Sequence, residues 1–411
     1  MLRPRPQLPL AIKPRHNKDS GKPMTRTPLL EQVAGDFYTN NFAKDAQDGS
    51  LILNLGPQHP STHGVLRVIV EMDGEYILRA EPVLGYLHRM HEKMAEVKTA
   101  AQFIPNMGRV DYGHALGWNW AFVGAVEKLA GIEVPPRAEY VRVITCELNR
   151  LASHLLWWGA YLLDLGAFTP IMYAFDDREK LLDILQIPTG SRLTYSYFRV
   201  GGVAEDLNDD CIRLIREFIP WMRSRLPMYK DLVSDNIILR KRIEGVGVIE
   251  SEVCRRYGAT GPVIRGSGVA YDVRRSDPYS VYPKLDFEIP TSPLMDARGR
   301  YDVRIAEFEQ SLRIIEQCLD MMPEGDVLVK GAPKPSWKAP KGEAYFAVEG
   351  ARGKIGVYLV SDGGKTLYRA KLRAPGYCNL SLFAEVSQGT ILADAVAILG
   401  SLDLIIPEID R

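Results

Sequence analysis

The feature that most constrains this chain is a long apolar segment with charged residues along one side. The segment opens at Pro135-Pro136, a pattern typical of a helix N-terminus, and is otherwise rich in Leu, Trp, Ala and Val. At about 100° of rotation per residue, its polar and aromatic side chains share an arc of roughly 100°. These residues are Glu147, Arg150, His154, Trp157, Tyr161 and Asp164. Because an unpaired buried charge is costly, the segment predicts a central core helix that faces other polar groups.

Two interpretations of this polar stripe remain open. A buried ion network that only stabilises the fold explains Glu147 and Arg150 well. For His154 and Asp164, a functional role is as reasonable as a structural one. A carboxylate beside an imidazole fixes its tautomer and raises its proton affinity, which serves catalysis as well as stability.

A second constraint is the stretch Gly56-Pro57-Gln58-His59-Pro60-Ser61-Thr62-His63-Gly64, which holds two of the seven histidines. Its prolines and glycines indicate a stiff turn, and the alternating run 65–70 that follows indicates a strand. A stiff turn can aim an imidazole at a substrate, since histidine titrates near neutral pH. The stretch can equally be a turn and nothing more.

Composition narrows the class of protein. The chain has 411 residues, is 46% hydrophobic and carries no net charge, which gives no support for a nucleic-acid-binding protein. Its five cysteines are scattered without a C-x-x-C pair, so neither a disulfide framework nor a metal or iron–sulfur site held by this chain alone is expected. No apolar run reaches the length needed to span a bilayer.

The pattern along the chain predicts an α+β fold that is mainly helical, with small sheets from about 51–80 and about 344–373. We expect a basic, proline-rich extension at 1–50, poorly ordered or draped on a partner, and then one domain at 51–411. That domain comprises a β hairpin at 51–83 around Asp73-Gly74, a helical core at 84–330, and a C-terminal β segment and tail at 331–411.

Within the helical core, the spacing of apolar residues predicts one helix over 85–103 and another that ends at Gly131. The acidic pair Asp176-Asp177 predicts the first turn of a short helix that begins near Phe175. In the C-terminal segment, Asp362-Gly363-Gly364 predicts the turn between two antiparallel strands.

Several motifs, in this order, resemble the D subunit, the 49 kDa-type quinone-site subunit of the proton-pumping NADH-quinone oxidoreductase known as respiratory complex I. The resemblance covers residues from about 51 to the C-terminus. The motifs are Gly56-Pro57-Gln58-His59-Pro60-Ser61-Thr62-His63-Gly64, Leu87-His88-Arg89, Asp111-Tyr112, Glu147-Leu148-Asn149-Arg150, Tyr197-Phe198-Arg199 and Val360-Ser361-Asp362-Gly363-Gly364.

That family is related to the large subunits of nickel–iron hydrogenases, which implies a hydrogenase-large-subunit-like helical core. Hydrogenases hold their metals with cysteine pairs near both ends of the chain. Here the regions 85–93 and 407–411 contain no cysteine, and soft metals need thiolates. The resemblance therefore implies that the ancestral metal cavity holds no metal and serves as a quinone head-group chamber.

The resemblance also implies roles for individual residues. His63 and Tyr112 are expected to donate hydrogen bonds to a quinone carbonyl, with Asp164 behind His63, while His59 shapes the loop. Electrons are expected from an iron–sulfur cluster held by the adjacent B subunit, near which Arg89 and His154 are expected to lie.

Partners and location also follow from the resemblance. The expected neighbours are the B, C and I subunits and the membrane-embedded H subunit, with quinone as the substrate and membrane association through the complex. The cytoplasmic face of a bacterial inner membrane is preferred over the matrix side of a mitochondrial one. Two alternatives stay open: a hydrogenase-like large subunit of a membrane-bound complex, and a scaffold whose cavity is inert.

Overall fold

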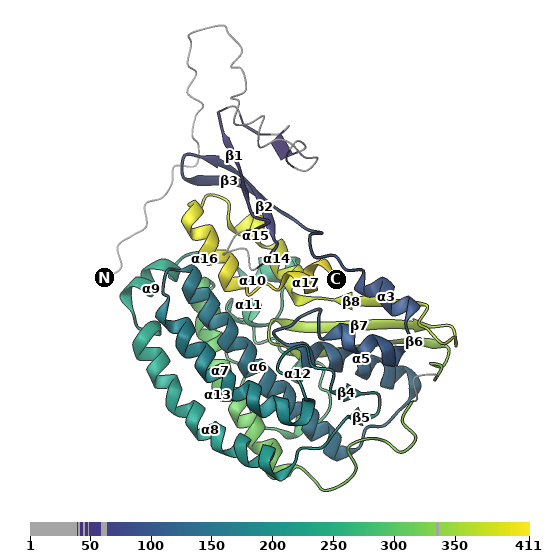
Figure 1. The fold of residues 1–411 in the computed structure, drawn as a ribbon. Coiled ribbons are helices and arrows are strands. Elements are labelled where there is room, and N and C mark those ends of the chain that lie inside the picture. The colour runs from purple at the N-terminus through teal and green to yellow at the C-terminus, as the bar shows by residue number, and fades with distance from the viewer. Residues whose placement is uncertain (1–38, 40–41, 44–45, 48, 59–63, 334–336) are drawn as a thin grey trace, which may run out of the picture.

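The computed structural model describes residues 39, 42–43, 46–47, 49–58, 64–333 and 337–411 (Figure 1). Over these residues, long helices form the body of the molecule and three small sheets lie around them. The prediction of a mainly helical α+β fold is therefore confirmed. None of the helices in this described part of the chain is long and apolar enough to cross a membrane.

The N-terminal sheet has the strand order β1 (Leu51–Leu55), β2 (Arg67–Asp73) and β3 (Tyr76–Val83), with both pairs antiparallel. The predicted hairpin turn is confirmed, and Gly74 adopts a φ of 59° in it. The sequence did not identify β1, because its residues Leu-Ile-Leu-Asn-Leu show no clean alternation. Pairing with β2 makes it a strand.

β2 is buried on both faces except at its last residue, Asp73. On one face, Val68 and Val70 join an apolar cluster with Leu399 and Leu402 from the C-terminal region. On the other face, Ile69 packs with Phe42, which belongs to the end of the N-terminal extension. The segment from Gly56 to Gly64 thus runs between two strands that pack against the rest of the domain. Its residues 59–63, which include His59 and His63, lie outside the described residues.

The predicted helix over 85–103 is wrong in its bounds, because two helices occupy this region. α3 (His91–Val97) ends at Lys98, and α4 (Ala100–Met107) begins immediately afterwards. The Thr99 side chain accepts a hydrogen bond from the Gln102 amide, and the Gln102 side chain accepts one from the Thr99 amide. This capping box starts a new helix where apolar spacing alone suggested continuity.

The long helices build the core. The helix predicted to end at Gly131 is confirmed: Gly131 is left-handed, with φ 67°, at the end of α5. α7 begins at Thr169-Pro170, so the short helix predicted from Phe175 is wrong in start and length, because Pro170 and not the acidic pair marks the first turn. The long helices are α5 (Ala115–Ala130), α6 (Pro136–Asp164), α7 (Thr169–Thr189), α8 (Asp209–Tyr229) and α13 (Ala297–Met321).

Figure 1 shows α6, α7, α8 and α13 together as a bundle. α6 contacts α5, α7, α13 and α16, and most of its side chains are buried, including Arg142, Glu147, Arg150 and His154. The predicted central helix with buried charges is therefore confirmed. Short elements complete this region: a π turn (Lys230–Ser234), α9 (Ile237–Ile243), α10 (Ser251–Arg256), α11 (Pro262–Arg265), α12 (Val273–Ser276) and a 3-10 turn (Tyr282–Lys284).

The C-terminal sheet consists of β6 (Gly342–Gly350), β7 (Gly353–Ser361) and β8 (Arg369–Arg373), all antiparallel, and it packs on α5. The turn predicted at Asp362-Gly363-Gly364 joins β7 and β8, as expected. A two-stranded ribbon, β4 (Phe198–Arg199) and β5 (Gly202–Val203), lies elsewhere on α5 and α6. The last helices, α14 (Pro375–Ser381), α15 (Phe383–Val386), α16 (Leu392–Leu402) and α17 (Ile406–Asp410), bring the C-terminus back beneath the N-terminal sheet (Figure 1).

Candidate functional site

Tyr112 lies in the loop between α4 and α5, and its neighbour Asp111 anchors that loop. Asp111 is buried, and its Oδ1 atom accepts hydrogen bonds from the amides of Gly113 at 2.9 Å and His114 at 3.1 Å. Its Oδ2 atom accepts a hydrogen bond from Arg352 Nη1 at 2.8 Å. The half-buried Tyr112 side chain is therefore carried on a fixed turn.

The environment of Tyr112 keeps its phenol protonated. Burial raises its pKa, the guanidinium of Arg352 opposes the rise, and the carboxylates of Asp111 and Asp403 add to it. Because an unperturbed tyrosine already titrates near pH 10, the Tyr112 phenol is a hydrogen-bond donor at neutral pH.

Arg352 joins segments that are far apart in the sequence. It occupies the tight turn between β6 and β7, and it bonds Asp111 before α5 and Asp403 after α16, the latter at 3.3 Å. Asp403 adopts a left-handed conformation, with φ 54°, at the C-terminus of α16. Burial opposes ionisation of Arg352, but its two carboxylate partners hold its pKa above its usual value.

Glu408 on α17 completes this group and is fully buried. Its Oε1 atom accepts a hydrogen bond from the Gly376 amide at 2.8 Å, and its Oε2 atom accepts one from the Trp118 indole at 3.3 Å. Burial and the negative charge of Asp111 raise its pKa to about 8, against the effect of Arg352. We call Asp111, Arg352, Asp403 and Glu408 the Arg352 cluster.

The sequence did not point to Arg352, Asp403 or Glu408. One local signal was available at Glu408, because this acid stands between Ile405-Ile406 and Ile409. An acid in such a setting is expensive to bury unless it is neutral or hydrogen-bonded. Arg352 and Asp403 have no comparable local signal, since a charged residue in a turn or at a helix end is ordinary.

The polar stripe of α6 forms a second buried network, centred on Glu147. Its Oε2 atom accepts hydrogen bonds from Arg150 Nε at 3.0 Å and Ser311 Oγ at 2.7 Å. Its Oε1 atom accepts hydrogen bonds from Arg274 at 3.0 Å and the Tyr282 hydroxyl at 2.7 Å. Burial alone would raise the pKa of Glu147, but Arg150 and Arg274 lower it to about 2. Each of these partners lies within the fold, which favours the structural interpretation for Glu147 and Arg150.

His154 lies one turn beyond Arg150 along α6 and has a carboxylate partner that the sequence did not reveal. Its Nε2 atom is 2.8 Å from Glu307 Oε2 on α13, and Glu307 Oε1 accepts a hydrogen bond from Arg265 Nη2 at 2.6 Å. Burial lowers the pKa of His154 despite Glu307. The imidazole is therefore neutral at pH 7 and donates a hydrogen bond through its Nε2–H group to the Glu307 carboxylate.

The other expected site residues within the described ranges are Asp164 and Arg89. Asp164 is half-buried as the last residue of α6, and Arg89 is exposed just before α3. In the part of the chain that the structure describes, neither residue forms a hydrogen bond or ion pair with Tyr112 or His154. The expected contact of Asp164 with His63, and the role of His59, fall on residues outside the described ranges.

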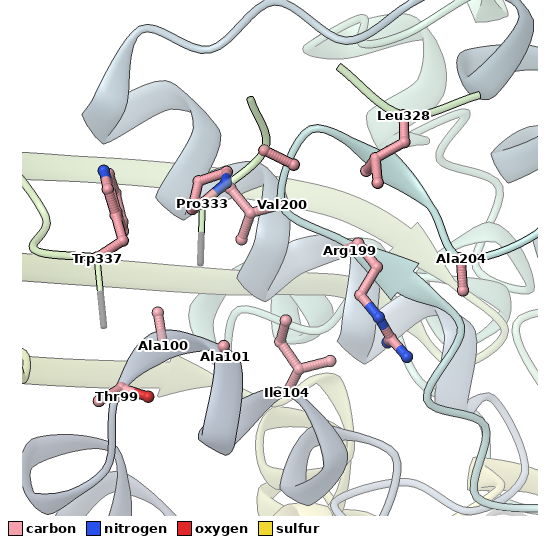
Figure 2. Close-up of a pocket in the computed structure, with 11 residues that line it drawn as sticks. Thr99, Ala100, Ala101, Ile104, Arg199, Val200, Ala204, Leu328, Pro333 and Trp337 are labelled. Atoms are coloured by element: carbon pink, nitrogen blue, oxygen red, sulfur yellow. The ribbon is translucent and has the colours of Figure 1, made fainter. Parts of the chain in front are cut away.

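Among the described residues, the cavities at the start of α4 and beyond the end of α6 are lined by no residue of the Arg352 cluster. One, of about 240 Å³, is mostly apolar and lies between the start of α4, the β4–β5 ribbon and the segment around Leu328 (Figure 2). Arg199 is its charged wall residue, and its guanidinium donates a hydrogen bond to the Ser196 carbonyl at 2.8 Å. A second cavity, of about 400 Å³, lies beyond the end of α6, between Leu165, Pro170 and Leu239. This second cavity includes Leu165, which follows Asp164 directly in the sequence.

Comparisons with known proteins identify the family. A family model described as the 49 kDa subunit of the respiratory-chain NADH dehydrogenase matches residues 164–338 and 333–411. The chain is 55% identical over 400 residues to the NADH-quinone oxidoreductase D subunit 2 of Opitutus terrae, covering 97% of this chain and 100% of the relative.

Other relatives are D subunits of the same enzyme. The one from Desulfotalea psychrophila is 57% identical over 364 residues, covering 89% of this chain and 98% of the relative. The one from Geobacillus thermodenitrificans is 48% identical over 360 residues, covering 88% and 98%. The ordered motifs, the fold and these identities lead to one conclusion: the chain belongs to the D-subunit, or 49 kDa, family of NADH-quinone oxidoreductase, and is a subunit of the complex I enzyme.

Proposed function

We propose that this chain forms the quinone head-group chamber of its complex together with the adjacent iron–sulfur B subunit. The observation that carries the proposal is Tyr112: a protonated phenol, half-buried, held on a turn that the Arg352 cluster anchors. The names of the relatives, which are NADH-quinone oxidoreductase subunits, supply the substrate class.

In the proposed chemistry, this chain supplies the protons and the B subunit supplies the electrons. Reduction of a quinone to a quinol takes two electrons and two protons. Tyr112 and His63 each donate a hydrogen bond and then a proton to a quinone oxygen as negative charge develops there. Asp164 orients His63 and stabilises its charged form, and His59 shapes the loop. Electrons come from the iron–sulfur cluster of the B subunit.

Arg89 and His154 are proposed to act near that cluster. Arg89 is exposed on this chain and so is accessible to a neighbouring subunit. His154 is buried and neutral, with Glu307 fixing its ring, so its effect on a partner's cluster would pass through the α6 surface and not through direct ligation.

Membership of the D-subunit family supports a proposal about the assembly. We propose that the B, C and I subunits and the membrane-embedded H subunit surround this chain, which associates with the membrane through the complex on the cytoplasmic face of a bacterial inner membrane. Quinone reduction at the shared site then drives proton translocation by the membrane arm.

The experiment that tests the site is Tyr112→Phe in the purified complex. We expect quinone reduction to fall at least tenfold, which corresponds to about 1.4 kcal/mol of lost transition-state stabilisation. Electron transfer from NADH to an artificial upstream acceptor should persist, which shows that the complex is assembled. Tyr368→Phe is the matched control, because Tyr368 is 70% exposed in the connection between β7 and β8, away from the Tyr112 loop.

Unchanged quinone reduction in Tyr112→Phe would mean that the phenol only packs against its neighbours. In that case the inert-scaffold alternative would gain support. A loss of both quinone reduction and upstream electron transfer would instead indicate failed assembly.

A further inference from the structure

A third cavity, of about 330 Å³, lies where the second half of α5 and the first turns of α6 meet β6 and the segment 277–280. Its walls combine aromatic rings with charged side chains. The described residues that line it include none from the Arg352 cluster and none from the polar stripe of α6. The proposed quinone chemistry therefore leaves this cavity without a role.

The buried charges at this cavity do not balance. The Arg142 side chain is 1% exposed and forms two bonds to Glu127, with Nη1–Oε2 at 3.0 Å and Nη2–Oε1 at 2.6 Å. Its Nη2 atom also donates hydrogen bonds to the carbonyls of Arg199 and Gly202. Glu139 lies one turn before Arg142 and is 3.6 Å from Arg142 Nη1. Two carboxylates thus share one guanidinium, which leaves an excess of negative charge at Glu139.

Glu139 also lacks a hydrogen-bond donor. In the part of the chain that the structure describes, its buried Oε2 atom has no hydrogen-bond partner, and neither has the buried hydroxyl of Ser280. Both residues line the cavity. Burial raises the pKa of Glu139, Arg142 and the nearby Ser280 hydroxyl oppose the rise, and the charge of Glu127 adds to it. A cation beside Oε2 would supply both the missing charge and the missing donor.

The loop that carries Ser280 is held in a conformation that serine rarely adopts. Ser280 is left-handed, with φ 54°, and such strain is often found at binding sites. Its neighbour Tyr279 packs edge-on against Trp120, with ring centroids 5.2 Å apart. The Tyr279 hydroxyl also accepts a hydrogen bond from the Glu349 amide at 3.1 Å. These contacts fix Ser280 at the cavity wall.

The aromatic walls suit an organic cation. Trp120, Tyr279 and Phe346 line the cavity, and Gly124 lets Phe346 lie directly against α5, because a Cβ there would be 2.4 Å from Phe346 Cε1. Aromatic rings attract cations and also pack well on methylene groups. Small-ligand sites are typically cavities of about 300–1,000 Å³ with apolar walls and a few polar groups. This cavity matches that description.

We propose that this cavity binds a primary ammonium group on an aliphatic stem, with Glu139 as its counter-ion. The source of the ammonium is either a lysine of a neighbouring subunit or a small free amine. One oxygen of Glu139 faces Arg142 and one is free, which suits the point charge of an ammonium. The planar fork of a guanidinium prefers to bind both oxygens of a carboxylate.

This inference goes beyond the proposed function and does not depend on it. The chain's own lysine at the cavity, Lys128, is exposed at its mouth and donates a hydrogen bond to the Tyr345 carbonyl at 3.1 Å. The exposed carboxylate of Asp277 also lies at the cavity wall and adds to the negative charge there. An incoming ammonium would therefore meet more acid than base.

The first test compares heat inactivation of quinone reduction in the wild-type complex and in Glu139→Gln. In an occupied cavity, this variant removes the counter-ion of the ammonium, so inactivation should be about tenfold faster. In an empty cavity, it only neutralises a buried carboxylate that has too little positive charge around it, so the complex should be at least as stable as the wild type. Glu133→Gln is the matched control, because Glu133 is exposed in the connection between α5 and α6.

The second test identifies the amine in the purified wild-type complex and needs no variant. A carbodiimide activates carboxyl groups, which then form an amide bond with an amine in direct contact. Mass spectrometry of the peptide that contains Glu139 should show an amide to a lysine of another subunit or to a small free amine. The first product assigns the ammonium to a neighbouring subunit, and the second assigns it to a diffusible ligand.

Each of three results would overturn the proposal. One is a Glu139→Gln complex that inactivates no faster than the wild type. Another is an amide between Glu139 and Lys128, which would mean that the chain's own lysine fills the cavity. The third is a Glu139 carboxyl that forms no amide after carbodiimide treatment, because a bound ammonium would be its nearest amine.

Discussion

The buried network around Glu147 makes a quantitative prediction about stability. Glu147→Gln keeps the shape of the side chain but removes its charge, which leaves Arg150 and Arg274 buried with one counter-charge fewer. In the fold, burial opposes ionisation of Glu147, but the two arginines lower its pKa from 4.5 to about 2. At 1.36 kcal/mol for each pKa unit, this difference corresponds to about 3 kcal/mol. Removal of one partner from a buried pair typically costs about 3–5 kcal/mol, which agrees.

The sign of the pH dependence follows from the direction of that shift. The folded-state pKa is depressed, so the stabilisation is fully present above about pH 4.5 and is lost as pH falls toward about 2. At pH 7, therefore, Glu147→Gln should lose the whole stabilisation that the ionised Glu147 provides.

The assay is the rate of heat inactivation of quinone reduction at pH 7, with recovery of the assembled complex as a second readout. Glu309→Gln is the matched control, because Glu309 on α13 also pairs with an arginine, Arg223, but these side chains are 44% and 34% exposed. An exposed pair contributes at most about 1 kcal/mol. If Glu147→Gln inactivates no faster than Glu309→Gln, the inference that the buried network contributes more to stability than an exposed ion pair is refuted.

Two further predictions concern residues that hold the candidate site in place. Arg352→Met leaves Asp111 and Asp403 buried without their shared cation, so we expect the free energy of unfolding to fall by about 3–5 kcal/mol. An immunoblot of purified membranes should then show little of this chain in assembled complex, and normal recovery would contradict the prediction. Thr99→Ala removes half of the capping box of α4 and should lower the stability of this helix by about 1 kcal/mol. Amide hydrogen exchange should become faster only at 100–107, and unchanged exchange there would count against the capping argument.

Helix and strand positions were predicted best where the signal is local. The turn at Asp73-Gly74, the C-terminal glycine of α5 and the prolines that open α6 each mark a boundary through the backbone conformation that the residue itself favours. The errors arose where two local signals competed. The apolar spacing predicted one continuous helix, whereas the capping box at Thr99 begins a new one. The acidic pair predicted a helix start near Phe175, whereas Pro170 marks the first turn.

The roles of the candidate site residues came from the family resemblance and not from local sequence signals. The donor role of Tyr112 came from the family resemblance and stays a prediction, and the structure adds the anchored loop and the raised pKa of its phenol. The roles of His59 and His63 stay predictions, because residues 59–63 lie outside the described ranges. The roles of Asp164, Arg89 and His154 also stay predictions, although His154 now has a defined partner in Glu307.

The sequence by itself determined that α6 is a central helix with a polar stripe, because helical periodicity places residues three and four apart on one face. Only the tertiary structure decided which groups meet that stripe and which surround Tyr112. Glu147 pairs with Arg274, His154 with Glu307, and Asp111 with Arg352 and indirectly with Asp403, across large sequence separations. Such pairs form because buried charges must find partners when helices and sheets pack, and packing between distant elements leaves no periodic signature in the chain.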